Sequence, residues 1–159
     1  MRNQNISLSA ALLAGAMLAA PAQAETVMTI NSTGVAIFNV KNVNLADGSI
    51  VQVIDSKYVW TQIDGDTAGQ SWGGFCYGLG RVSPEGVYTG QSRCEDSMSA
   101  EDSYTTEYTE TAEGGEWVVT GGKGKFAGAT GSGQIVYTWG DAVFGDRITM
   151  TSVGSITLP

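Results

Sequence analysis

Histidine is absent from the 159 residues, and cysteine occurs only twice. Without histidine the chain has no Ser-His-Asp or Cys-His catalytic site, and the commonest protein ligand of transition metals is missing. Cys76 and Cys94 lie too far apart for a C-x-x-C redox motif. The sequence therefore predicts no metal site and no cofactor, and it assigns no catalytic residue.

Basic residues are also scarce. Eight Lys and Arg stand against 16 Asp and Glu, and the formal net charge is −8. A surface of this charge repels polyanions, which argues against nucleic acid and anionic lipid as partners.

A long hydrophobic run is missing beyond the N-terminus. The apolar stretch Leu8–Ala20 follows Arg2 and precedes Ala22-Gln23-Ala24, which is the order of a secretory signal peptide. A retained anchor helix is the alternative, but the stretch is shorter than the roughly 20 residues that span a bilayer. We expect residues 1–24 to be cleaved and residues 25–159 to form one domain, without membrane insertion, in the periplasm or outside the cell.

The two cysteines are expected to pair, because an exported chain folds in an oxidising compartment. Cys76 would tie one strand near its middle to Cys94, at the end of its hairpin partner. In the chain-entropy model such a loop contributes roughly 3 kcal/mol of stability.

Alternation with a period of two dominates the rest of the chain and predicts an all-β fold. The predicted strands are Thr26–Ile30, Val35–Val40, Ser49–Gln62, Ser71–Arg81, Val87–Arg93, Ser103–Thr111, Trp117–Thr120, Gln134–Trp139 and Asp146–Leu158. Turns are expected at Asn31–Gly34, Asp47-Gly48, Asp64–Gly69, Ser83–Gly86, Glu113–Glu116 and Gly140–Gly145, with a polar connection at Glu95–Ala100. Eight or nine short strands favour a single closed antiparallel barrel, which leaves no exposed sheet edge.

The stretch Gly121–Gly133 is rich in glycine and holds one large apolar residue, Phe126. Glycine reaches positive φ at no steric cost, so the stretch is typical of two tight bends in quick succession. We expect Phe126 to enter the apolar interior and to anchor this connection between two strands.

The same residues carry a family resemblance. Gly122–Gly133 resembles the GGTGxFxGaxGxG signature of allene-oxide-cyclase-like and dirigent-like barrels, especially their small secreted bacterial members. The residues of this barrel motif are Gly122, Gly124, Phe126, Gly128, Gly131 and Gly133. The resemblance implies an eight-stranded antiparallel barrel around an apolar cavity. Lys123 stands where threonine is usual, and no pocket residue of the plant proteins can be matched, so no catalytic role is carried over.

Aromatic residues recur at i, i+2 spacing, which places each pair on one face of its strand. The candidate ligand-binding residues are Tyr58, Trp60, Tyr104, Tyr108, Tyr137 and Trp139. They fit either a cavity for a small hydrophobic or aromatic molecule or the packing of a filled barrel. A buried acid such as Asp55 or Glu107 could move a proton.

Two acidic clusters invite comparison with calcium sites. Asp64-Gly-Asp66 opens like a calcium loop but lacks the ligands that should follow, and a weak calcium site is the alternative interpretation for the cluster of Glu95, Asp96, Glu101 and Asp102. Solvated loops account better for both.

Three functions remain open. The first is a secreted or periplasmic barrel that binds a small hydrophobic or aromatic ligand. The second is a cyclase- or isomerase-type enzyme acting in the cavity, and the third is a homo-oligomeric structural or interaction barrel without ligand. An outer-membrane barrel fits the signal peptide, but most strands lack the required lipid-facing apolar alternation.

Overall fold

The fold was taken from a computed structural model, which describes residues 25–139 and 147–159. Its elements are β1 (Thr26–Asn44), β2 (Ile50–Gln62), β3 (Ser71–Val82), β4 (Tyr88–Ser97), β5 (Ser103–Glu110), β6 (Gly114–Lys123), the 3-10 helix η1 (Gly124–Phe126), β7 (Thr130–Trp139) and β8 (Arg147–Leu158). Among these residues no helix has the length and apolar character needed to cross a bilayer.

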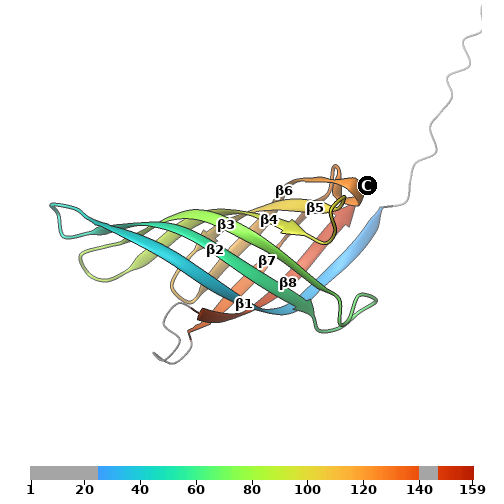
Figure 1. The fold of residues 1–159 in the computed structure, drawn as a ribbon, viewed down its shortest axis with the longest axis horizontal. Coiled ribbons are helices and arrows are strands. Elements are labelled where there is room, and N and C mark those ends of the chain that lie inside the picture. The colour runs from blue at the N-terminus through green and yellow to red at the C-terminus, as the bar shows by residue number, and fades with distance from the viewer. Residues whose placement is uncertain (1–24, 140–146) are drawn as a thin grey trace, which may run out of the picture.

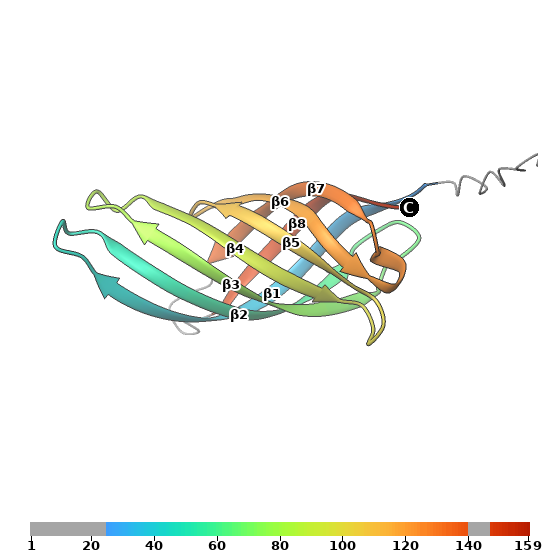
Figure 2. The same cartoon turned by 90° about the horizontal axis from the view of Figure 1, so that it is seen from above.

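The eight strands form one closed antiparallel barrel in sequence order (Figures 1 and 2). Strand β1 closes it, because its residues pair with β8 from Thr26↔Leu158 onwards and with β2 up to Asn44↔Ile50. The prediction of an all-β closed barrel is confirmed.

The predicted turn at Asn31–Gly34 is wrong, because β1 runs through it without a break. Ser32 pairs with both Gln62 and Ser152, so these residues are held between two neighbouring strands. Gly34 gives the reason for the turn-like composition: a Cβ there would lie 2.6 Å from the Trp60 ring. Small and polar residues make room for a large ring here instead of bending the chain.

Other boundaries differ less from the prediction. Strand β4 continues to Ser97 through part of the expected polar connection, and β7 begins at Thr130, inside the glycine-rich stretch. Turns at Asp47-Gly48 and Ser83–Gly86 are confirmed, with positive φ at Gly48 and Gly86. The predicted turn at Gly140–Gly145, the first residue of the last predicted strand, Asp146, and the predicted signal peptide lie outside the described residues.

The glycine-rich stretch closes one end of the barrel. Gly124 and Gly128 have φ of 63° and 81°, which gives the two expected bends, and between them η1 delivers Phe126 to the interior with 0% exposure. The Phe126 ring lies 4.8 Å from that of Tyr104.

Three further glycines of the motif leave space for neighbouring groups. A Cβ at Gly122 would strike Phe126, one at Gly131 would strike the Ser155 carbonyl, and one at Gly133 would strike the Trp117 ring. The motif is therefore accounted for by packing at the closed end.

Buried side chains fill much of the barrel. The apolar core consists of Ile30, Ala36, Tyr58, Trp60, Trp72, Cys94, Tyr104, Tyr108, Trp117, Phe126, Ala129, Ile135, Ile148, Met150 and Ile156. The predicted disulfide is present and links Cys76 to Cys94, which are direct cross-strand partners in β3 and β4.

Candidate functional site

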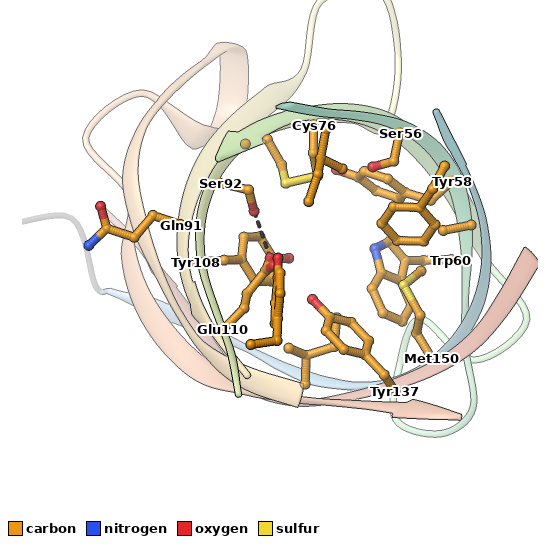
Figure 3. A pocket seen from close by; sticks show the side chains of 17 residues that line it. Ser56, Tyr58, Trp60, Cys76, Gln91, Ser92, Tyr108, Glu110, Tyr137 and Met150 are labelled. Carbon is orange, nitrogen blue, oxygen red and sulfur yellow. Dashed lines mark hydrogen bonds between the residues drawn. A yellow bond between two sulfur atoms is a disulfide. The ribbon is translucent and has the colours of Figure 1, made fainter. Parts of the chain in front are cut away.

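The barrel interior is narrow in its middle and wide at one end. The middle, which we call the lumen, is lined by residues including Tyr58, Trp60, Tyr108 and Met150, and its free cavity measures only about 30 Å³ (Figure 3). The end opposite η1, which we call the mouth, opens to about 580 Å³. Phe38, Ile54, Tyr88, Glu110 and Tyr137 line both, so the two cavities are continuous.

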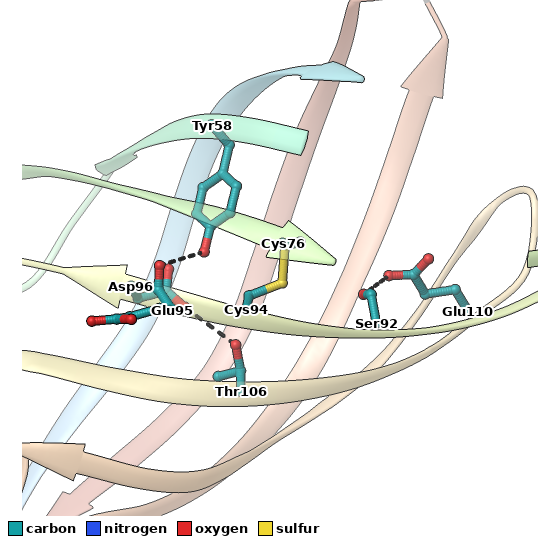
Figure 4. Close-up of a disulfide and its surroundings, with 8 residues drawn as sticks. All are labelled: Tyr58, Cys76, Ser92, Cys94, Glu95, Asp96, Thr106 and Glu110. Carbon is teal, nitrogen blue, oxygen red and sulfur yellow. Dashed lines mark hydrogen bonds between the residues drawn. A yellow bond between two sulfur atoms is a disulfide. The ribbon is translucent and has the colours of Figure 1, made fainter. Parts of the chain in front are cut away.

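Glu110 is the acidic residue at the junction of mouth and lumen. The Ser92 hydroxyl donates a hydrogen bond of 2.7 Å to its Oε1 (Figures 3 and 4). Tyr88 and Tyr137 line the same cavity as this carboxylate. Burial, followed by the charge of Glu110, raises the pKa of Tyr88 to about 12, and the same causes raise that of Tyr137. Both phenols therefore stay protonated and uncharged at neutral pH.

The fixed aromatic rings of the mouth come from β1 and β7. The Trp139 indole is 61% exposed, yet its N–H donates to the Ala112 carbonyl at 2.8 Å. Its ring centroid lies 6.4 Å from both Phe38 and Tyr137. Because the hydrogen bond and the neighbouring rings hold the exposed indole in place, it offers a preformed contact surface for an apolar or aromatic group.

A second acid, Asp96, lies beyond the lumen on the side of the closed end. It is 1% exposed and accepts a 3.2 Å hydrogen bond from Thr106 (Figure 4). Burial raises the pKa of Asp96 to about 7, against the opposing effect of the Thr106 hydrogen bond and of the nearby Tyr58 and Trp72 side chains. The Tyr58 hydroxyl also lies 3.4 Å from the Glu95 carbonyl, and the disulfide separates this group from Glu110 (Figure 4).

The suggestion that Asp55 or Glu107 is a buried acid is wrong. Asp55 and Glu107 both lie on the outer face of the barrel, where Asp55 accepts a hydrogen bond from Asn39 and Glu107 faces Arg93 at 3.7 Å. The signal for the acids that point inward is the alternation itself. Asp96 follows the inward Cys94 by two residues, and Glu110 follows Tyr108 by two.

The six predicted aromatic residues fall into three groups. Tyr58, Trp60, Tyr108 and Tyr137 line the lumen, and Tyr137 reaches the mouth, where Trp139 also lies. Tyr104 instead packs on Phe126 at the closed end. The binding role of all six stays a prediction.

Of the two acidic clusters, which were expected to be solvated loops, Asp64 and Asp66 are exposed as expected, whereas Asp96 in the second cluster is buried. Asp96 points inward, whereas the Asp102 carboxylate accepts a hydrogen bond from the Lys125 backbone N–H. Asp64 accepts one from the Asn31 amide. No set of three or more metal-binding side chains gathers in the part of the chain that the structure describes.

Exposed apolar side chains occur on several strands, most of them on β1, β2 and β3. These include Val35, Ile37, Val59, Tyr77 and Leu79. A homo-oligomer stays a prediction.

No family model and no curated protein matches this sequence. Among solved structures, the pterocarpan synthase dirigent protein GePTS1 superposes with a TM-score of 0.54 at 15% identity, over 85% of this chain and 90% of that one. The pterocarpan synthase dirigent protein PsPTS1 gives 0.49 at 13% identity, over 86% and 96%. The likeness to GePTS1 shows that the chain has the dirigent-like barrel fold. The resemblance to allene oxide cyclases and to secreted bacterial members stays an expectation.

Proposed function

We propose that this barrel binds a small molecule with an apolar or aromatic body at its mouth. The observation that carries the proposal is a cavity of about 580 Å³ lined by Phe38, Tyr88, Tyr137 and Trp139. That volume lies within the roughly 300–1,000 Å³ of small-molecule sites. The lumen is too small for such a body, so the molecule rests at the mouth and extends only a narrow group inward.

The protein is exported in this proposal. Residues 1–24 act as a signal peptide, and residues 25–159 fold as one barrel domain in the periplasm or outside the cell. The Cys76–Cys94 disulfide supports an oxidising compartment. N-terminal sequencing of the protein recovered from its source should begin at Glu25. An N-terminus that still carries Leu8–Ala20 would contradict export by cleavage.

The binding test uses the neutral fluorescent probe N-phenyl-1-naphthylamine with the purified, oxidised protein. Its fluorescence should rise on addition of protein and saturate with one probe per chain. Trp139→Ala should weaken binding by about tenfold, the factor that 1.4 kcal/mol represents. Tyr77→Ala is the matched control, because Tyr77 is an exposed aromatic residue on the outer face, away from the mouth.

Native mass spectrometry of protein purified from its source complements the titration. A co-purified small molecule that the Trp139→Ala variant loses supports the mouth as the site. Absence of probe binding, together with protein free of any small molecule, would reject the proposal in favour of a structural barrel.

Asp96 favours a second function, proton transfer to a bound molecule. A carboxyl group with a pKa of about 7 can both give and take a proton at neutral pH, and Tyr58, which lines the lumen, contacts it. GePTS1, a solved barrel of this fold, is described as a pterocarpan synthase. If this chain is an enzyme, Tyr58→Phe should abolish turnover of its substrate and leave probe binding within about twofold, less than 1 kcal/mol. Equal turnover in both proteins would exclude this role.

A further inference from the structure

Among the described residues, the side chains that line the mouth bring one negative charge and no positive one. Glu110 is the acidic residue that lines it, and within the described ranges none of the residues that line it is Lys or Arg. Arg81, bound to Asp47 at 3.1 Å, and Arg93, facing Glu107, do not line this cavity.

A hydroxyl group holds the Glu110 carboxylate without neutralising it. Ser92 on β4 donates a hydrogen bond to Glu110 on β5, and the uncharged phenols of Tyr88 and Tyr137 line the same cavity. One hydroxyl donor and no lining cation leave the site with a net charge of about one unit, because neutral hydroxyls add none. Fixing the carboxylate in advance lowers the ordering cost of binding.

Aromatic rings line the cavity around this carboxylate. Phe38, Tyr88 and Tyr137 line both the lumen and the mouth, as Glu110 does, and Trp139 lines the mouth beside Phe38 and Tyr137. The face of an aromatic ring carries negative electrostatic potential, and rings grouped around an anion attract organic cations, most strongly quaternary ammonium groups.

We propose that the mouth is a site for an organic cation, an amine or quaternary ammonium group attached to an apolar or aromatic body. The cation lies between the Glu110 carboxylate and the rings of Tyr88, Tyr137 and Trp139, and the body packs against Phe38 and Ile54. This inference rests on the proposed function and adds the charge of the ligand to it. Anionic amphiphiles such as fatty acids are repelled by the same carboxylate.

The test compares two molecules of nearly equal shape that differ in charge. Benzyltrimethylammonium and its carbon analogue neopentylbenzene each compete with N-phenyl-1-naphthylamine for the oxidised protein. We expect the cation to compete at least about tenfold better, which is 1.4 kcal/mol. Glu110→Gln keeps a hydrogen-bond acceptor for Ser92 and should remove this preference while affinity for neopentylbenzene stays within about twofold.

Glu107→Gln is the matched control, because it removes the same charge from the same strand on the outer face. It should leave both affinities unchanged. Thermal unfolding of the two variants shows whether each is folded. The wild-type protein supplies a second readout that needs no variant: added salt should weaken the cation and not the neutral analogue.

The two proposals fail in different ways. If neither competitor nor the probe binds, the proposed function fails and the inference fails with it. If the probe binds but both competitors act equally well, or if Glu110→Gln behaves like Glu107→Gln, the charge preference is refuted while the binding function stands.

Discussion

At the scale of single residues, Asp96 is the most informative group in the barrel. It lies at 1% exposure among Tyr58, Thr106 and Trp72, and no cation among the described residues offsets its burial. A buried acid without a cation shifts toward its neutral form, and the shift must appear in the stability of the fold.

The sign of this effect follows from proton binding. The pKa of Asp96 rises from 3.8 to about 7 on folding, so the folded protein binds more protons between these values and the free energy of unfolding falls as pH rises. The loss from pH 4 to pH 8 should be up to about 4 kcal/mol. Urea unfolding across this range should show that Asp96→Asn removes the decline and is the more stable protein at pH 8. Asp55→Asn, on the outer face, should keep the wild-type slope; an equal slope in all three proteins would disprove the assignment.

Gly74 is the second residue with a testable role, because it makes room for the Tyr58 and Asp96 group. A Cβ at Gly74 would lie 2.5 Å from the Tyr58 hydroxyl and would strike the Glu95 carbonyl. Gly74→Ala should therefore cost about 2 kcal/mol or more in urea unfolding, as overpacking against a rigid backbone does. Gly121→Ala is the control, since a Cβ there meets nothing within 4 Å. Similar midpoints for the two variants would count against close packing at Gly74.

At the scale of elements, the glycine-rich connection with η1 was predictable and the course of β1 was not. Two bends and one buried ring follow from glycine and phenylalanine chemistry within a short stretch. The run Asn31–Gly34 reads as a turn from its own residues, and its pairing with β2 and β8, both far away in sequence, keeps it extended. Strand pairing on both sides of β1 therefore outweighs the turn propensity of these four residues.

The inner face shows the same limit. Alternation placed the aromatic residues correctly on shared faces, but it did not show which face of each strand points into the barrel. The inward-facing acids Asp96 on β4 and Glu110 on β5 could therefore not be distinguished from acids that face solvent. Asp96 was placed in a loop because Glu95–Ala100 is polar; its burial depends on Thr106 and Tyr58 from two other strands.

Substitution of Phe126 tests whether η1 closes this end of the barrel. Its side chain is fully buried and packs on Tyr104, so Phe126→Ala should destabilise the barrel by about 3–5 kcal/mol. Phe75→Ala removes the same ring from an exposed site on β3 and should cost far less. Chemical unfolding of both variants decides the matter, and comparable losses would mean that η1 does not seal the core.

At the scale of the whole molecule, the barrel depends on the seam between β1 and β8. Thr26 and Leu158 are paired residues, so the two ends of the described chain lie side by side. The sequence predicted a closed barrel of about eight strands, since an open sheet would leave two edges, but it could not identify which strand bridges the seam.

A circular permutant tests this seam. Joining residue 158 to residue 26 with a short glycine-serine linker, and opening the chain between Gly65 and Asp66, should give a protein that unfolds cooperatively, because the new ends lie in an exposed turn. Opening the same permutant between Ser32 and Thr33 cuts β1 where it pairs with both neighbours, and should prevent folding. Circular dichroism during heating distinguishes the two, and equal stability would imply a real break in β1.

The same seam sets the order in which a newly made chain can mature. Residues 26–37 pair with residues 147–158. The backbone N–H and C=O groups on that side of β1 therefore stay unpaired until β8 has been synthesised. Until then the newly made sheet has two unpaired edge strands, and these can pair with another copy of the chain. A chaperone that holds unfolded chains would suppress this misassembly. Without one, the yield of folded barrel should fall as the protein concentration during refolding rises.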